Sequence, residues 1–188
     1  MKKSKFILTA IVLIALLFIN GMVAYFTDID ISNNTFIIGK VNINLSETDW
    51  NEANGKNLLP SKTIPKNPVI TNETNSNDAY IFAKVIVPYK DQQLFTYTLN
   101  NGWELVEKPY IDTKLNTITY IYSYSVNSTM TKLYAGNSTP AIFNTVTFAN
   151  ITDPSIVNGV NLDIIVEAYG IQSNNLSIDT PADIFKLF

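Results

Sequence analysis

The carboxylates are the side chains of this sequence whose spacing could support catalysis. Glu104 and Glu107 lie three residues apart beside Trp103. Glycosidases use two carboxylates, one to protonate the leaving group and one to attack the sugar or activate water. The same pattern is typical of a solvated hairpin, which is the interpretation we favour. We therefore predict no catalytic residue and no enzymatic activity.

The composition excludes most other site chemistry. The 188 residues contain no histidine and no cysteine, and every basic residue is a lysine. Nucleophilic triads, His- or Cys-ligated metals and disulfides are thereby excluded. Without arginine, and with a formal net charge of -3, the chain is not expected to bind nucleic acid. No cofactor is expected.

Two acidic stretches carry the oxygen ligands that calcium prefers. One contains Asp28 and Asp30, and the other is a polar loop with Glu73 and Asp78. Neither stretch has the central glycine and distal glutamate of an EF-hand loop. Alternate carboxylates also occur on any exposed strand, so we expect solvated segments here and no metal site.

The aromatic residues form one regular pattern. Tyr120, Tyr122 and Tyr124 are spaced two apart and so share one face of a strand. Such a face can stack on carbohydrate or pack in cross-strand pairs, and we favour packing. Trp50 and Trp103 are predicted packing anchors at the ends of sheets.

The N-terminus has the pattern of an export signal. Lys2, Lys3 and Lys5 precede an apolar run over residues 6–19, and small residues follow up to Ala24. The run is shorter than a membrane-spanning helix. We predict a signal peptide over residues 1–24, cut between Ala24 and Tyr25 or, as the alternative, after Tyr25. An uncleaved anchor is the second reading, and the signal is the only predicted membrane contact.

The rest of the chain, residues 25–188, reads as a single β-rich domain. Val41, Ile43 and Leu45 alternate with asparagines, which predicts a half-buried strand. The apolar run 79–87, ended by Pro88, predicts a central strand. Further strands are predicted at 68–71, 94–99, 103–106, 117–126, 141–148 and 162–169. Short strands separated by turns predict an all-β, antiparallel, jelly-roll-like sandwich, with a C-terminal helix capped by Thr180.

Several motifs, in order along the chain, resemble those of the TasA/camelysin family. Residues 21–28 read Gly-Met-Val-Ala-Tyr-Phe-Thr-Asp, and residues 34–41 read Asn-Thr-Phe-Ile-Ile-Gly-Lys-Val. The resemblance continues through 59–68, 75–80, Gly102-Trp103, 133–148 and 167–172. It implies a Gram-positive protein exported with a SipW-type signal and cut by a SipW-type signal peptidase. It also implies a jelly-roll-like sandwich and a secreted or cell-surface location.

For the TasA branch the resemblance implies assembly into matrix fibres by strand donation between copies. Segment 25–38 is rich in β-formers and would be the donor; its candidate assembly residues are Tyr25, Phe26, Ile29, Ile31, Phe36 and Ile38. The alternative is that residues 25–45 form the first strands of their own sandwich. An accessory anchoring or assembly protein is a further expected partner.

The camelysin branch of the family carries a metallopeptidase label. A zinc peptidase of that kind needs two imidazoles with a glutamate base, and this chain has no histidine. We therefore expect a non-enzymatic structural protein that polymerises at the cell surface or in the extracellular matrix. A monomeric surface module that binds glycan or peptide is the alternative from another functional class.

Overall fold

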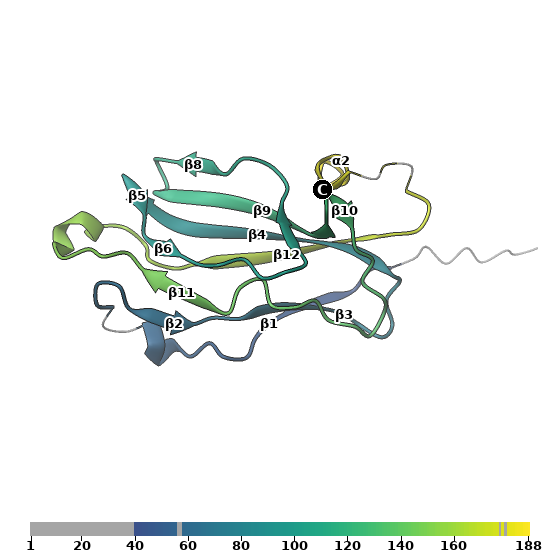
Figure 1. The fold of residues 1–188 in the computed structure, drawn as a ribbon, viewed down its shortest axis with the longest axis horizontal. Coiled ribbons are helices and arrows are strands. Elements are labelled where there is room, and N and C mark those ends of the chain that lie inside the picture. Colours follow the sequence, from purple (N-terminus) through teal and green to yellow (C-terminus); the bar gives the residue numbers. More distant parts are fainter. Residues whose placement is uncertain (1–39, 56–57, 177, 179) are drawn as a thin grey trace, which may run out of the picture. The chain divides into compact units, whose positions relative to one another are not determined.

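The computed structural model describes residues 40–55, 58–176, 178 and 180–188. These residues belong to one compact unit, which runs from Ile38 to Phe188. The predicted signal segment, the bond between Ala24 and Tyr25, the donor segment 25–38 and the acids Asp28 and Asp30 lie outside the described residues. The described part consists mainly of antiparallel strands arranged as a sandwich (Figure 1), so the predicted fold class is confirmed.

The first layer is a sheet centred on β4 (Ala79–Lys90). On one side β4 pairs with β12 (Ile165–Gln172), and on the other with β9 (Thr117–Val126). Shorter strands extend this sheet: β5 (Gln92–Gln93) on β4, and β7 (Trp103–Leu105), β8 (Tyr110–Asp112) and β10 (Thr129–Met130) on β9. Within the described residues, β12 is therefore an edge strand.

The second layer combines two smaller sheets. β1 (Ile43–Glu47) pairs with β3 (Pro68–Asn72), and β11 (Thr145–Phe148) lies between β2 (Thr63–Pro65) and β6 (Phe95–Thr96). Backbone bonds join the two sheets, because the Thr139 N–H donates to the Ile70 carbonyl and the Ile142 N–H to the Pro68 carbonyl. Residues 62–72 thus lie antiparallel to residues 136–148. The chain crosses repeatedly between the layers, as in a jelly roll.

The core lies between the layers because side chains alternate along each strand. Ala79, Ile81, Ala83, Val85 and Val87 of β4 are completely buried. From the second layer they are met by buried apolar side chains, among them Ile64, Ile70, Phe95, Ile142, Phe143 and Val146. Burial of this apolar surface is the main force that holds the sandwich together, since the chain has no disulfide.

The outer face of the first layer carries a smaller apolar cluster. The helix α2 (Pro181–Phe185) begins as predicted, with Thr180 Oγ1 accepting from the Asp183 N–H and proline in the first turn. Ile184 is buried against Phe82. Beyond the end of α2, the Phe188 ring lies 5.9 Å from the Phe82 ring, although Phe188 and Leu187 are both about half exposed.

Several strands begin or end at other residues than the sequence predicted. β4 continues through Pro88 to Lys90, because Pro88 still offers a carbonyl, which accepts from the Leu94 N–H. The strand predicted at 94–99 is reduced to β6, and the one at 141–148 begins at Thr145. Two short 3-10 helices lie in the loops, η1 (Glu52–Gly55) and η2 (Pro154–Val157). In the described part no helix is long and apolar enough to cross a membrane.

Candidate functional site

The edge of the sandwich between β1 and β12 is the candidate functional site. β12 pairs only with β4 and β1 only with β3 among the described strands. The inward side chains at this edge pack against the core but are only half-buried; they are Val41, Ile43 and Leu45 near β1, and Val166 and Ala168 on β12. The edge therefore presents unpaired strand backbone beside apolar side chains, which is the surface that an added strand requires.

One end of this edge is tightly closed. A Cβ placed on Gly170 of β12 would lie 2.9 Å from Val41 Cγ1 and 3.2 Å from Ile43 Cγ2. Only glycine permits this approach, because a real Cβ essentially never comes within 3.0 Å of another heavy atom. The two layers are in direct contact here and leave little room for an additional side chain.

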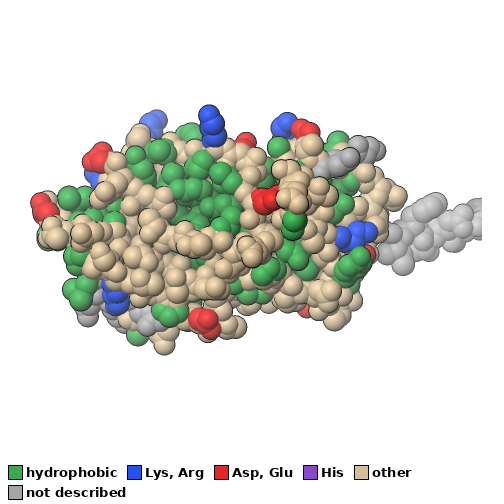
Figure 2. Space-filling view, in the orientation of Figure 1, with side chains coloured by type: hydrophobic (Ala, Val, Ile, Leu, Met, Phe, Trp, Pro, Cys, Tyr) green, Lys and Arg blue, Asp and Glu red, His purple; other side chains and the backbone are tan. Residues whose placement is uncertain are grey.

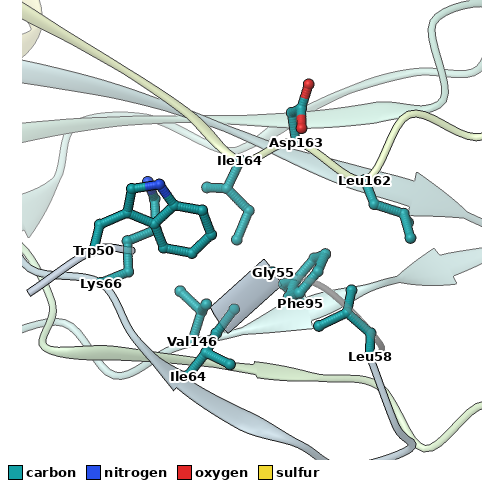
Figure 3. Close-up of a pocket in the computed structure, with 10 residues that line it drawn as sticks. All are labelled: Trp50, Gly55, Leu58, Ile64, Lys66, Phe95, Val146, Leu162, Asp163 and Ile164. Atoms are coloured by element: carbon teal, nitrogen blue, oxygen red, sulfur yellow. The ribbon is translucent and has the colours of Figure 1, made fainter. Parts of the chain in front are cut away.

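The other end opens into a cavity of about 520 Å³. Figure 3 shows apolar side chains from both layers converging on it. Its lining residues are Trp50, Gly55, Leu58, Ile64, Lys66, Phe95, Val146, Leu162, Asp163 and Ile164. In Figure 3 the Asp163 carboxylate points away from the cavity, so the space itself is mainly apolar and aromatic.

A second cavity, of about 440 Å³, adjoins the first. The two share Gly55, Leu58 and Leu162, and the second continues between the 3-10 helix η2 and residues 58–60. Ile151, Val157 and Phe148 line it. The apolar space at this end of the sandwich is therefore wide enough for bulky side chains.

A buried ion pair forms one wall of the first cavity. The Lys66 ammonium lies 2.6 Å from Glu47 Oε2 and 2.8 Å from Glu47 Oε1, and 5.0 Å from the centre of the Trp50 ring. The side chain of Lys66 is 7% exposed and that of Glu47 20%. Since the carboxylate neutralises the ammonium, the cavity does not favour an anionic ligand.

Lys66 was not identified from the sequence, although its position held a signal. Ile64, Lys66, Pro68, Ile70 and Asn72 alternate with exposed or half-exposed residues, and all five are buried. The period of two therefore points Lys66 inward with the apolar residues. Only the partner, Glu47, was unpredictable, because it comes from another strand.

Glu104, from the glycosidase-like pair, has a structural role. Its carboxylate accepts from Ser125 Oγ at 2.8 Å, from the Asn127 N–H at 2.7 Å and from the Ser128 N–H at 2.8 Å. These hydrogen bonds, that from Ser125 foremost, hold the pKa of Glu104 below its ordinary value. Asn127 and Ser128 have φ of 52° and 59°, so Glu104 clamps the strained turn between β9 and β10.

The tyrosines pack within the protein. The rings of Tyr124 and Trp103 are 5.8 Å apart in a cross-strand pair, and the Tyr122 hydroxyl lies 2.8 Å from that of Tyr97. Burial raises the pKa of Tyr122 to about 12. Tyr120 donates to Gln93 Oε1 at 2.6 Å. The three tyrosines of β9 therefore serve packing rather than forming a free aromatic face, as favoured from the sequence.

Trp103 is also the anchor that the sequence predicted. It is 4% exposed and donates from Nε1 to the Pro140 carbonyl at 3.0 Å. Trp50, by contrast, is half-buried and lines the cavity.

The second calcium candidate shows no arrangement for a cation. Asp78 Oδ1 accepts from the Ala135 N–H at 3.3 Å. In the part of the chain that the structure describes, no three acidic side chains gather closely enough to hold a metal ion. Figure 2 shows charged side chains scattered over the face in view, with apolar side chains gathered near its centre.

The described residues thus define a class of protein: a β-sandwich with an apolar edge whose strands have no second partner among them. The family model described as camelysin metallo-endopeptidase matches residues 1–89, just under half of the chain, up to β4. Over this part the chain is similar to the TasA/camelysin family, a family of secreted or cell-surface proteins. No curated protein and no solved structure matches the chain.

Proposed function

We propose that this protein is a structural subunit of extracellular or cell-surface fibres. After a SipW-type signal peptidase removes residues 1–24, segment 25–38 of one copy would add as a strand to the next copy. The observation that carries the proposal is the edge between β1 and β12, where the strand backbone has no partner among the described residues and the inward side chains are half-buried. An added strand would pair the backbone and cover those side chains.

The length of the donor segment agrees with the length of the edge that would accept it. An extended strand rises about 3.3 Å per residue, so segment 25–38 can span about 46 Å and the eight residues of β12 about 26 Å. The segment is therefore long enough to cover the edge and still leave residues for a connection. A contact that joins different surfaces of two copies does not close on itself and so generates a filament.

Catalysis is not part of the proposed function, despite the family's name. The whole chain lacks histidine and cysteine, and the described residues contain no acidic metal cluster. We expect the pure protein not to cleave casein, with or without a metal chelator. Casein cleavage that a chelator abolishes, in a preparation free of other proteases, would refute this part of the proposal.

A binding module is the second candidate, because a cavity of about 520 Å³ falls within the range of small-molecule pockets. The two candidates differ in their solution behaviour. A binding module stays monomeric at every concentration and changes its Trp50 fluorescence only when a ligand is added.

The experiment compares protein that starts at Tyr25 with protein that starts at Gly39, by negative-stain electron microscopy and sedimentation. The longer chain is expected to form filaments and the shorter one to remain monomeric and folded. Filaments of the same kind from both chains would refute strand donation. A monomer from both would favour the binding module. An accessory protein that anchors or starts the fibres is a further expected partner.

A further inference from the structure

The described chain begins at one end of the candidate edge, and the cavity lies at the other end. The described chain begins at Lys40, whose carbonyl accepts from the Asn77 N–H in the turn before β4. This end also contains Gly170, against which Val41 packs. β1 then runs to the opposite end, where Trp50, Leu162 and Ile164 line the cavity. The described chain therefore begins at the end of the sandwich that is far from its cavity.

From this polarity we infer that the donated segment inserts in one direction, with Phe36 in the cavity lined by Trp50 and Phe95 of the next copy. The inference rests on the proposed function. In a head-to-tail filament, the Lys40 end of the donor faces the cavity end of the acceptor. Phe36 is separated from the donor's Lys40 by only three residues, so it is the aromatic residue of the segment that lies nearest to the acceptor's cavity. The earlier residues of the segment then extend toward Gly170.

This direction agrees with strand pairing. β12 runs from the cavity toward Gly170, because Ile165 lies beside Ile164 and Gln172 lies beyond Gly170. A donor that runs from Tyr25 near Gly170 to Phe36 at the cavity is antiparallel to β12. Every strand pair in the described part is antiparallel, including β12 with β4. The donor would extend that pattern by one strand.

The side chains also fit this direction. Ile29 and Ile31 alternate with Asp28 and Asp30, so the isoleucines can face inward while the acids face solvent. Phe36 is an odd number of residues from both isoleucines, so it faces inward with them only when the polar stretch 32–34 contains a one-residue bulge. A phenylalanine suits the wide cavity, whose apolar lining includes two aromatic rings and whose lysine is neutralised by Glu47.

Insertion of the segment into its own sandwich would give the opposite direction. The chain would turn back at Gly39, so that Phe36 would lie near its own Gly170 and the earlier residues, including Ile29, near the cavity. The residue found at the cavity therefore distinguishes donation in the inferred direction from self-insertion.

Cysteine cross-linking tests the inference in the protein that starts at Tyr25, because this chain has no native cysteine to interfere. One variant carries Phe36→Cys and Leu162→Cys, and the matched control carries Ile29→Cys and Leu162→Cys. Leu162 is half-buried at the shared wall of both cavities. After mild oxidation of filaments, the first variant is expected to give a ladder of covalent multimers on a non-reducing gel. The control should give none.

The alternative outcomes each have one meaning. A ladder from the Ile29→Cys variant, without one from the Phe36→Cys variant, would overturn the inferred direction while leaving filament formation intact. A cross-linked monomer from the Ile29→Cys variant would show self-insertion and overturn it as well. Filaments without any cross-link would also overturn it. Absence of filaments from the unmodified chain would instead refute the proposed function.

Folding of the variants is checked by circular dichroism and thermal unfolding before oxidation. If Leu162→Cys does not fold, Leu58→Cys replaces it, since Leu58 lines the same two cavities. The expected and contrary results are then the same as for Leu162.

Discussion

Replacing Gly170 by alanine should destabilise the fold, because it inserts a methyl group where β12 and β1 are in closest contact. The added Cβ would lie 2.9 Å from Val41 Cγ1, 3.2 Å from Ile43 Cγ2 and 3.3 Å from Ile43 Cδ1. The first distance is too short for a stable contact, so Val41 must move. The other two are tight and resist that movement.

The expected loss is the difference between two effects. Overpacking of a well-packed core by a methyl group costs about 1–3 kcal/mol. Replacing glycine by alanine also reduces the freedom of the unfolded chain, which stabilises the fold by about 0.4–1 kcal/mol. The free energy of unfolding of Gly170→Ala should therefore fall by about 0.5–2 kcal/mol. In a domain of this size, each kcal/mol lowers Tm by about 2–4 °C.

The assay is urea unfolding followed by tryptophan fluorescence, combined with a double-mutant cycle through Val41→Ala. Alone, Val41→Ala should cost about 1 kcal/mol, because the valine is half-buried. It also removes the atom that the new methyl group would meet. The double variant should therefore be about 1 kcal/mol more stable than the sum of the single effects predicts.

One result of the double-mutant cycle would contradict the contact between Val41 and Gly170. If the two single effects add without coupling, Val41 does not contact β12 at Gly170, and the described closure of this end is wrong. Gly159→Ala is the matched control, because no atom lies within 4 Å of its added Cβ and its φ is +76°. It should lose stability only through backbone strain, with no dependence on Val41.

The remaining predictions concern the ion pair, the turn clamp and the buried indole. Lys66→Met should lower the free energy of unfolding by about 2–4 kcal/mol, because Glu47 loses its partner; adding Glu47→Gln should recover part of this in urea unfolding, and no recovery would contradict the pairing. Glu104 has a lowered pKa, so its contribution is present above the ordinary glutamate pKa and disappears as the pH falls through the lowered value. Glu104→Gln should thus weaken the loss of Tm in acid, and an unchanged acid profile would refute the clamp. Trp103→Phe should cost about 1–3 kcal/mol, since the Pro140 carbonyl loses its donor; a neutral effect in thermal unfolding would contradict this.

The sequence predicted the strands whose pattern is set by local burial. Residues 79–87 form most of β4 because nearly every position there is apolar, and the helix after Thr180 forms because its capping hydroxyl and proline act within one turn. The tyrosines at 120, 122 and 124 share a face because side chains alternate along any strand. These are properties of neighbours in the chain, which the sequence contains in full.

The sequence did not predict features that depend on partners distant in the chain. Leu94 to Leu99 alternates like a strand, but only Phe95 and Thr96 pair as a strand, with β11. Glu104 could be interpreted as half of a catalytic pair, because the turn donors at Asn127 and Ser128 are more than twenty residues away.

The sequence by itself determined the class of molecule: absence of histidine and cysteine excludes the common catalytic and metal chemistries, and alternation of apolar residues requires a two-faced sheet. Only the tertiary structure decided that β12 has no second partner among the described strands, that Gly170 closes one end of the edge, and that Trp50 and Lys66 line a cavity at the other. The physical reason is that composition and the alternation of apolar residues are properties of neighbours along the chain. An open edge and a cavity are instead formed by strands and loops that meet only after folding.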